Sequence, residues 1–138
     1  MGARDSNSPT LTIRCTGEDA VHRMVEGAQA FSADCRLESA QSARLAIIVE
    51  ELVFNLVEHG GVGASGLIEL VLSHRDAAVE IALSDSGIAF DPRGAESQEA
   101  IPERGGGAGI DLVRAWAEIL DYGTHAGSNR LLLKMWLS

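Results

Sequence analysis

Cysteine is scarce in this sequence, and its spacing excludes the usual structural roles of the residue. Only Cys15 and Cys35 occur among 138 residues, they form no Cys-x-x-Cys pair, and no histidine stands at metal-ligand spacing from either. Because free cysteine is one of the most often buried residue types, we expect two buried free thiols in preference to a disulfide. Free thiols fit a reducing compartment, so we expect a cytoplasmic protein.

Basic residues are also scarce, and long apolar segments are lacking. Lys and Arg number 11 against 20 Asp and Glu, so the formal net charge at pH 7 is −9. A negative average potential repels phosphate groups, which disfavours non-specific binding to nucleic acid or anionic lipid. No apolar run approaches the roughly 20 residues of a membrane-spanning helix, and the N-terminal residues lack a signal-peptide core. We expect protein and small-molecule partners, with no nucleic acid and no membrane.

The length and the balance of residue types indicate one compact domain. Hydrophobic residues make up 46% and charged residues 22% of the chain, as is typical of a domain with a single core. No internal repeat or low-complexity tract interrupts it. Residues 1–9 are polar and are expected to form a flexible tail, which leaves residues 10–138 as the domain.

Hydrophobic periodicity predicts the order of helices and strands. Helices are expected at about 19–35, 38–59 and 107–120. Strands are expected at about 10–15, 67–73, 78–84 and 131–137, with turns at 74–77 and 127–129. The irregular segment between residues 85 and 107 is long enough to be a functional loop. Strand, two helices, two strands, loop, helix, and one or two strands predict an α+β fold, a two-layer sandwich with helices on one face of a mixed sheet.

Glu51 and Asn55 are the first candidate site residues. They stand at i and i+4 in a predicted helix, one turn apart on the face opposite Leu52 and Leu56. An Asn carbonyl oxygen suits Mg²⁺, and a nearby carboxylate can accept a proton from an attacking hydroxyl. Taken alone, the pair is more typical of the solvated face of an amphipathic helix.

A second cluster begins at Asp85, immediately after a predicted strand, and continues through Gly87 to Asp91. A carboxylate at a strand end can accept a hydrogen bond from an exocyclic amine. A glycine such as Gly87 lets the backbone pass close to a flat ring. Taken alone, a segment rich in Asp, Ser, Gly and Pro is more typical of an ordinary turn.

The third cluster runs from Arg104 through the glycines that precede a predicted helix. These glycines are Gly105, Gly106, Gly107 and Gly109. Unpaired N–H groups at the positive end of a helix favour phosphate, and Arg104 could add positive charge. The segment lacks the Gly-Lys-Ser/Thr ending of a P-loop and follows no strand, as a Rossmann fingerprint would. A mobile glycine hinge is the alternative.

Taken in order, the clusters resemble the nucleotide-site boxes of the superfamily that unites DNA gyrase, heat-shock chaperone, histidine-kinase and mismatch-repair ATPases. Glu51-x-x-x-Asn55 resembles its N box, Asp85-x-Gly87-x-x-x-Asp91 its first glycine box, and Gly107-x-Gly109 its second. The segments EELVFNLVEHG, DSGIAFDP and GGGAGIDLVRAW are most similar to bacterial anti-sigma-factor serine/threonine kinases, also called switch-protein kinases. This resemblance covers residues 10–138 and implies a histidine-kinase-like ATPase fold that binds ATP and Mg²⁺.

The resemblance also implies a role for each site residue. Glu51 would be the general base, Asn55 the Mg²⁺ ligand and Asp85 the adenine reader. The remaining nucleotide-binding positions would be Gly87, Asp91, Arg104, Gly105, Gly106, Gly107, Gly109 and Ser128. Ser128 stands where relatives often carry a threonine near adenine and would supply that hydroxyl. Ala89 and Gly61 depart from the family pattern, in which a glycine and an aromatic residue are common at these places.

The partners follow from the same resemblance. Such kinases phosphorylate a serine or threonine of a small STAS-domain antagonist protein, many sequester a sigma factor, and they commonly form homodimers through the sheet and the first strand. An ATP-dependent regulator that binds proteins without phosphorylating them remains an alternative, and a plain ATPase is a third. Transfer needs a base whereas binding does not, so the presence of Glu51 favours the kinase.

Overall fold

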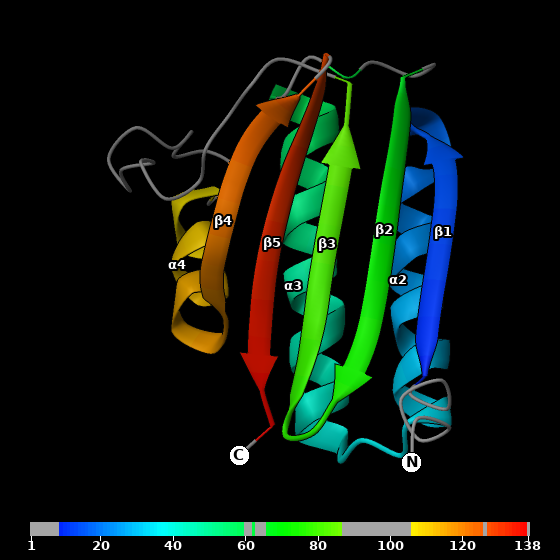
Figure 1. Cartoon of the computed structure of the whole chain (residues 1–138), viewed down its shortest axis with the longest axis vertical. Helices are drawn as coiled ribbons and strands as arrows, with labels where there is room; N and C mark the ends of the chain where they lie inside the picture. Colours follow the sequence, from blue (N-terminus) through cyan, green and yellow to red (C-terminus); the bar gives the residue numbers. More distant parts are fainter. Residues whose placement is uncertain (1–8, 60–61, 63–65, 87–105, 126, 138) are drawn as a thin grey trace.

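The computed structural model describes residues 9–59, 62, 66–86, 106–125 and 127–137. Along the chain the elements are β1 (Thr10–Thr16), α2 (Gly17–Asp34), α3 (Ser39–His59), β2 (Leu67–Arg75), β3 (Ala78–Asp85), α4 (Gly106–Trp116), β4 (Glu118–His125) and β5 (Ser128–Trp136). The three helices all lie behind one face of the five-stranded sheet (Figure 1). The predicted two-layer α+β sandwich is therefore confirmed.

The sheet has the strand order β1-β2-β3-β5-β4, and each neighbouring pair is antiparallel. The prediction of a mixed sheet is wrong in this respect. Strands β3 and β4 run in the same direction (Figure 1), because the chain crosses from one to the other through α4. Strand β5 then lies between them and runs in the opposite direction. Because β5 separates the two, no parallel pair forms within the described sheet.

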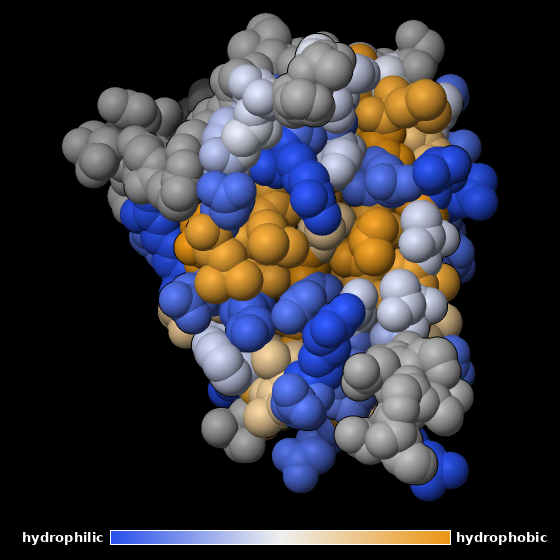
Figure 2. Space-filling view, in the orientation of Figure 1, coloured by the Kyte–Doolittle hydropathy of each residue, from blue (hydrophilic) through white to orange (hydrophobic). Residues whose placement is uncertain are grey.

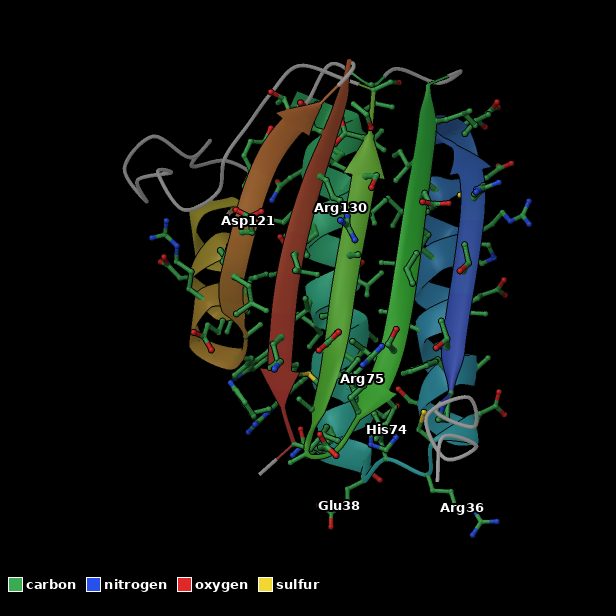
Figure 3. The ribbon with its side chains drawn as sticks, in the orientation of Figure 1. Arg36, Glu38, His74, Arg75, Asp121 and Arg130 are labelled. Atoms are coloured by element: carbon green, nitrogen blue, oxygen red, sulfur yellow. The ribbon has the colours of Figure 1, made fainter. Side chains whose placement is uncertain are left out.

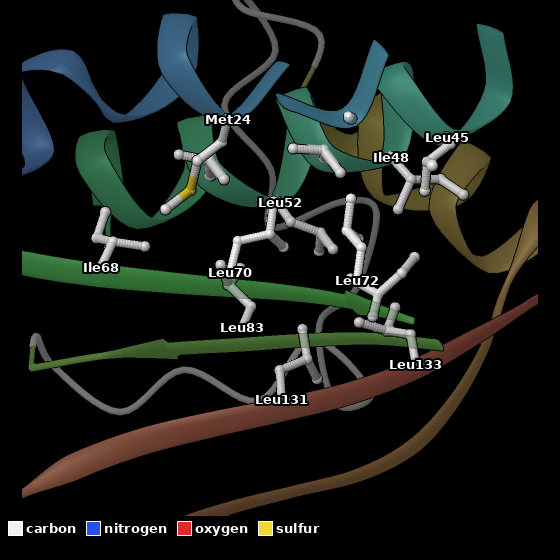
Figure 4. Close-up of a cluster of buried hydrophobic side chains, with 14 of the residues drawn as sticks. Met24, Leu45, Ile48, Leu52, Ile68, Leu70, Leu72, Leu83, Leu131 and Leu133 are labelled. Carbon is white, nitrogen blue, oxygen red and sulfur yellow. The ribbon is translucent and has the colours of Figure 1, made fainter. Parts of the chain in front are cut away.

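Apolar side chains from the sheet and the helices fill the space between the two layers (Figure 4). The alternation along the strands sends every second residue toward the helices. The central members are each at most 6% exposed. They are Met24, Leu45, Ile48, Leu52, Ile68, Leu70, Leu72, Leu83, Leu131 and Leu133. Each such side chain contributes about 1.5–3 kcal/mol relative to an exposed one, so this layer holds the helices on the sheet.

The chain after α4 differs from the prediction. The third helix was expected to reach Leu120, yet α4 ends at Trp116 and residues from Glu118 onward form the edge strand β4. Trp116, Ile119 and Leu120 are spaced like a helical stripe, and an irregularity between Ile119 and Asp121 breaks the two-residue alternation of the strand. Pairing with β5 decides the conformation here, because β4 completes the sheet edge.

Two local features fix the ends of the sheet. The hairpin between β2 and β3 needs only two residues, and Asp76 adopts a left-handed φ of 53°, which Asp tolerates better than most residues. The carbonyl of Pro9 accepts a hydrogen bond from the backbone N–H of His74 at 3.0 Å, so Pro9, which was assigned to the tail, is attached to β2. Residues 1–8 of the predicted tail lie outside the described residues. None of the described helices has the length and apolar character required to cross a membrane.

Candidate functional site

The candidate site residues gather at one end of the sandwich. The C-terminal ends of α3 and β3 and the N-terminal ends of β5 and α4 point to the same end, which is uppermost in Figure 1. Sequence clusters that lie tens of residues apart therefore meet where these elements end. Elements that end together leave side chains and backbone groups free to face a ligand.

Asp85 is the last residue of β3 and faces the helices. Val79, Ile81 and Leu83 precede it on the same face of the strand, and its side chain is only 6% exposed. Asn129 on β5 lies directly across from it, and its Nδ2 donates a hydrogen bond to Oδ1 of Asp85 at 3.1 Å. Burial of a carboxylate costs free energy unless hydrogen bonds replace water. The neighbouring strand therefore holds this carboxylate in a defined orientation.

Ser128 joins the same group. Its hydroxyl donates a hydrogen bond to the backbone carbonyl of Asp85 at 3.3 Å. The structure thus brings the first residue of β5 to the end of β3, next to the residue predicted to recognise adenine. Ser128 as a whole is exposed, so a ligand can reach it.

Asn129 is a site residue that sequence reasoning missed. Residues 127–129 were assigned to a turn, whereas β5 already begins at Ser128. The signal was present: Leu131, Leu133 and Met135 are the buried positions of β5, and the same alternation extended back by two residues places Asn129 on the inner face.

Asn55 lies in the last third of α3 and is only 9% exposed, so the alternative interpretation of this residue as part of a solvated helix face does not hold. The reason is the position of α3 in the middle of the helix layer, between α2 and α4 (Figure 1), so that more than the sheet-facing side of the helix is covered. Nδ2 of Asn55 has no hydrogen-bond partner among the described residues. A buried amide N–H without a hydrogen-bond partner lowers the stability of the fold by about 1–3 kcal/mol. The protein tolerates this cost at the end of the domain where the other candidate site residues lie.

Glu51 precedes Asn55 by one turn of α3, so both side chains project from the same side of the helix. Glu51 is half-buried, whereas its neighbour Glu50 is exposed. The two residues therefore lie on one face of α3, and their roles as base and metal ligand stay predictions. The donor set also fits a hydrated magnesium ion, because an Asn carbonyl is a hard oxygen ligand and Mg²⁺ often takes few protein ligands beside phosphates and water.

The glycine cluster lies at the beginning of α4. Gly106, Gly107 and Gly109 fall in its first turn, so the helix begins one residue earlier than predicted. The first four N–H groups of a helix have no partner within the helix, and no acidic residue stands in the first turn to compete for them. Gly87, Asp91, Arg104 and Gly105 lie outside the described residues, and their assigned roles stay predictions.

The described residues thus form a two-layer α+β domain with buried polar side chains and a helix N-terminus at one end. A family model of the histidine kinase-like ATPase domain matches residues 16–135, and the chain belongs to this family. No curated protein sequence matches the chain.

Solved structures with the same fold include the RsbU and RsbW domains of Rv1364c from Mycobacterium tuberculosis, with a TM-score of 0.62 and 20% identity. That comparison covers 94% of this chain and 32% of the other. The blue-light activated histidine kinase of Erythrobacter litoralis EL346 gives a TM-score of 0.56 at 19% identity over 74% of this chain and 32% of that one. Its separate histidine kinase domain gives 0.54 at 15% identity, over 88% and 61%. The chain thus spans a third to three-fifths of these proteins, and the likeness concerns the fold.

Proposed function

We propose that this chain is a regulatory protein serine/threonine kinase that uses ATP with Mg²⁺ to phosphorylate a small STAS-domain antagonist protein. The observation that carries the proposal is the buried Asn55 amide, whose Nδ2 has no partner among the described residues, one helical turn from Glu51. A costly unpaired group is expected where a ligand completes the hydrogen bonding. Membership of an ATPase family supports a nucleotide as that ligand.

Asp85 is the proposed adenine reader. Asn129 already donates to Oδ1, and a carboxylate has lone pairs for further donors, so the exocyclic amine of adenine can donate to the same group. Ser128 lies against the carbonyl of Asp85 and would add a hydroxyl beside the base. Recognition through an oriented carboxylate favours a base with an amine at this position over one with a carbonyl.

The phosphates would lie toward the beginning of α4 and the end of α3. Backbone N–H groups of the first turn of α4, which contains Gly106, Gly107 and Gly109, would donate to phosphate oxygens. Asn55 would hold Mg²⁺, which supplies positive charge against the phosphates. Glu51 would accept the proton of the attacking serine or threonine hydroxyl, since it projects from the same helix face.

A homodimer that also sequesters a sigma factor or similar regulator is part of the proposal. The open face of the sheet supports self-association, because Val71, Ala82 and Leu132 lie side by side across three strands and form an apolar strip (Figure 2). Charged residues of the neighbouring rows flank the strip, including the ion pair between Arg14 Nε and Glu69 Oε2 at 2.6 Å. Arg75 and Arg130 also project from this face, so Arg130 points away from Asp85 and is not a phosphate ligand (Figure 3).

The test is transfer of label from γ-labelled ATP to a panel of purified STAS-domain proteins, with Mg²⁺ and with the metal chelated. Magnesium-dependent labelling of a serine or threonine in at least one of them is expected. Asn55→Ala should abolish both nucleotide binding and labelling. Nucleotide binding without any labelling would favour the alternative, a regulator that binds proteins in an ATP-dependent manner.

A further inference from the structure

A hollow lies at the opposite end of the molecule from the nucleotide residues. It is open to solvent, has a volume of about 470 Å³, and lies between the first half of α3, the end of α4, the start of β4 and the end of β5. These element ends are lowermost in Figure 1, whereas the candidate nucleotide residues are at the upper end. Its lining comprises Arg44, Trp136 and residues 114–118, none of which the proposed kinase site uses.

Both tryptophans of the chain line this hollow, and each carries a cation against its ring. The guanidinium carbon of Arg44 is 5.5 Å from the ring centroid of Trp116, and Nζ of Lys134 is 4.9 Å from that of Trp136. Nε1 of Trp136 donates to Oε1 of Glu118 at 3.4 Å. These contacts fix the orientation of the indoles before any ligand arrives.

Burial does not explain why Trp136 is present, since 53% of its surface is exposed. An exposed, pre-oriented indole is typical of a binding surface, because Trp and Arg carry a large share of the energy at protein interfaces. Trp136 therefore offers apolar area to a partner at little further cost in side-chain entropy. Ala115 and Ala117 leave room beside it, since their side chains end at a single methyl group.

The charge around the hollow is opposite to that of the molecule as a whole. The lining contains two arginines, Arg44 and Arg114, against one acidic residue, Glu118. Lys134 lies against Trp136 outside the lining, and Glu80 pairs with it at 4.0 Å. The chain carries a formal net charge of −9, so this is a local basic region on an acidic protein. An acidic segment of a partner matches this local basic region.

We propose that this hollow docks an acidic peptide segment of a partner protein. A bulky apolar side chain of that segment packs against the indoles that line the hollow, and its flanking carboxylates meet Arg44 and Arg114 of the lining. Docking here leaves the nucleotide end of the molecule uncovered. Docking in this hollow does not require phosphoryl transfer, so it would also occur if the protein binds its partner without phosphorylating it.

The two tryptophans provide the assay. A ¹⁵N-labelled sample gives one indole N–H signal for each of the two tryptophans, and both report on the hollow. The probe is a synthetic peptide of about 12 residues with Glu and Asp around a central Leu. Controls are the same peptide with Lys in place of the acids and one with Gly in place of Leu. Saturable shifts of both signals by the first peptide alone are expected.

Matched variants test the charge and the indole separately. Arg44→Glu should weaken the acidic peptide by about tenfold or more, the effect of losing a contact worth at least about 1.4 kcal/mol. Arg23→Glu makes the same charge change at an exposed site on α2 and should alter affinity less than about twofold. Trp136→Ala should also weaken the peptide while the melting temperature stays near that of the parent, because the ring is half exposed.

Four results of the peptide titrations would overturn the proposal. These are no shift with any peptide, equal shifts with the acidic and basic peptides, unchanged affinity in Arg44→Glu, and shifts that depend on the concentration of the protein itself. The last would assign the hollow to a contact between copies. Shifts of the same size on addition of ATP alone would assign it to a small anion.

Discussion

The two buried asparagines of the site should respond to truncation in opposite ways. Asn55 has an Nδ2 without a partner among the described residues, whereas Nδ2 of Asn129 donates to Asp85 at 3.1 Å. In Asn55→Ala, removal of an unsatisfied amide recovers about 1–3 kcal/mol. The small cavity left behind costs on the order of 1 kcal/mol. The free energy of unfolding should therefore stay the same or rise by about 2 kcal/mol.

Asn129→Ala is the matched control, since it removes the same group at a similar depth. It breaks a hydrogen bond to a carboxylate, worth about 1.5–3 kcal/mol, and leaves the buried oxygen of Asp85 with one donor fewer. With the cavity included, the free energy of unfolding should fall by about 2–4 kcal/mol.

Urea unfolding without nucleotide measures both changes, and calorimetry with ATP and Mg²⁺ measures binding. Asn55→Ala should lose magnesium-dependent nucleotide binding although its fold is at least as stable as the parent. A loss of more than about 2 kcal/mol in Asn55→Ala would show that the amide has structural partners and refute the argument. Unchanged nucleotide affinity would remove its role as a ligand.

Two further predictions concern the rest of the domain. A Cβ on Gly66 would collide with the backbone carbonyl of Val62, so Gly66→Ala should lower the free energy of unfolding by about 1–3 kcal/mol, and an unchanged urea midpoint would contradict that contact. Burial raises the pKa of the Cys15 and Cys35 thiols, so less thiolate is present near pH 8. Arg23 partly opposes this rise in pKa at Cys15, whereas Asp34 adds to it at Cys35. Cys15 is buried as expected, whereas Cys35 is only half-buried. Both should react with a disulfide reagent more slowly in the folded protein than in urea, and equal rates for Cys15 would contradict its burial.

Most of the fold could be predicted because its hydrophobic patterns are regular. The first two helices and the first three strands end within two residues of the predicted positions. Apolar residues alternate along β3 and recur every 3.6 residues along α3, because one side of each element packs against the other layer. Such patterns are visible in the local sequence. The C-terminal end of α4 was predicted wrongly because the local pattern there is irregular. The irregularity in β4 gives this strand apolar residues at helical spacing, and only its pairing with β5 shows that the segment is a strand.

The site was predicted in part for a related reason. Glu51, Asn55 and Asp85 stand at helical spacing or at a strand end, which the sequence displays. The burial of Asn55 depends on helices packed on both sides of α3, and the partner of Asp85 comes from a strand more than 40 residues later. Such facts belong to tertiary structure, so a local pattern could not supply them.

Glu51→Gln tests the central claim most directly, with Glu50→Gln as its control on the adjacent, exposed position of α3. The measurement is the rate of phosphate transfer from ATP to the STAS-domain protein that the parent labels, with nucleotide affinity determined in parallel. If Glu51 accepts the hydroxyl proton, Glu51→Gln should bind ATP normally yet transfer about 10²–10⁴-fold more slowly, whereas Glu50→Gln should match the parent. Equal slowing in both variants, or a change of less than about tenfold in Glu51→Gln, would contradict the account.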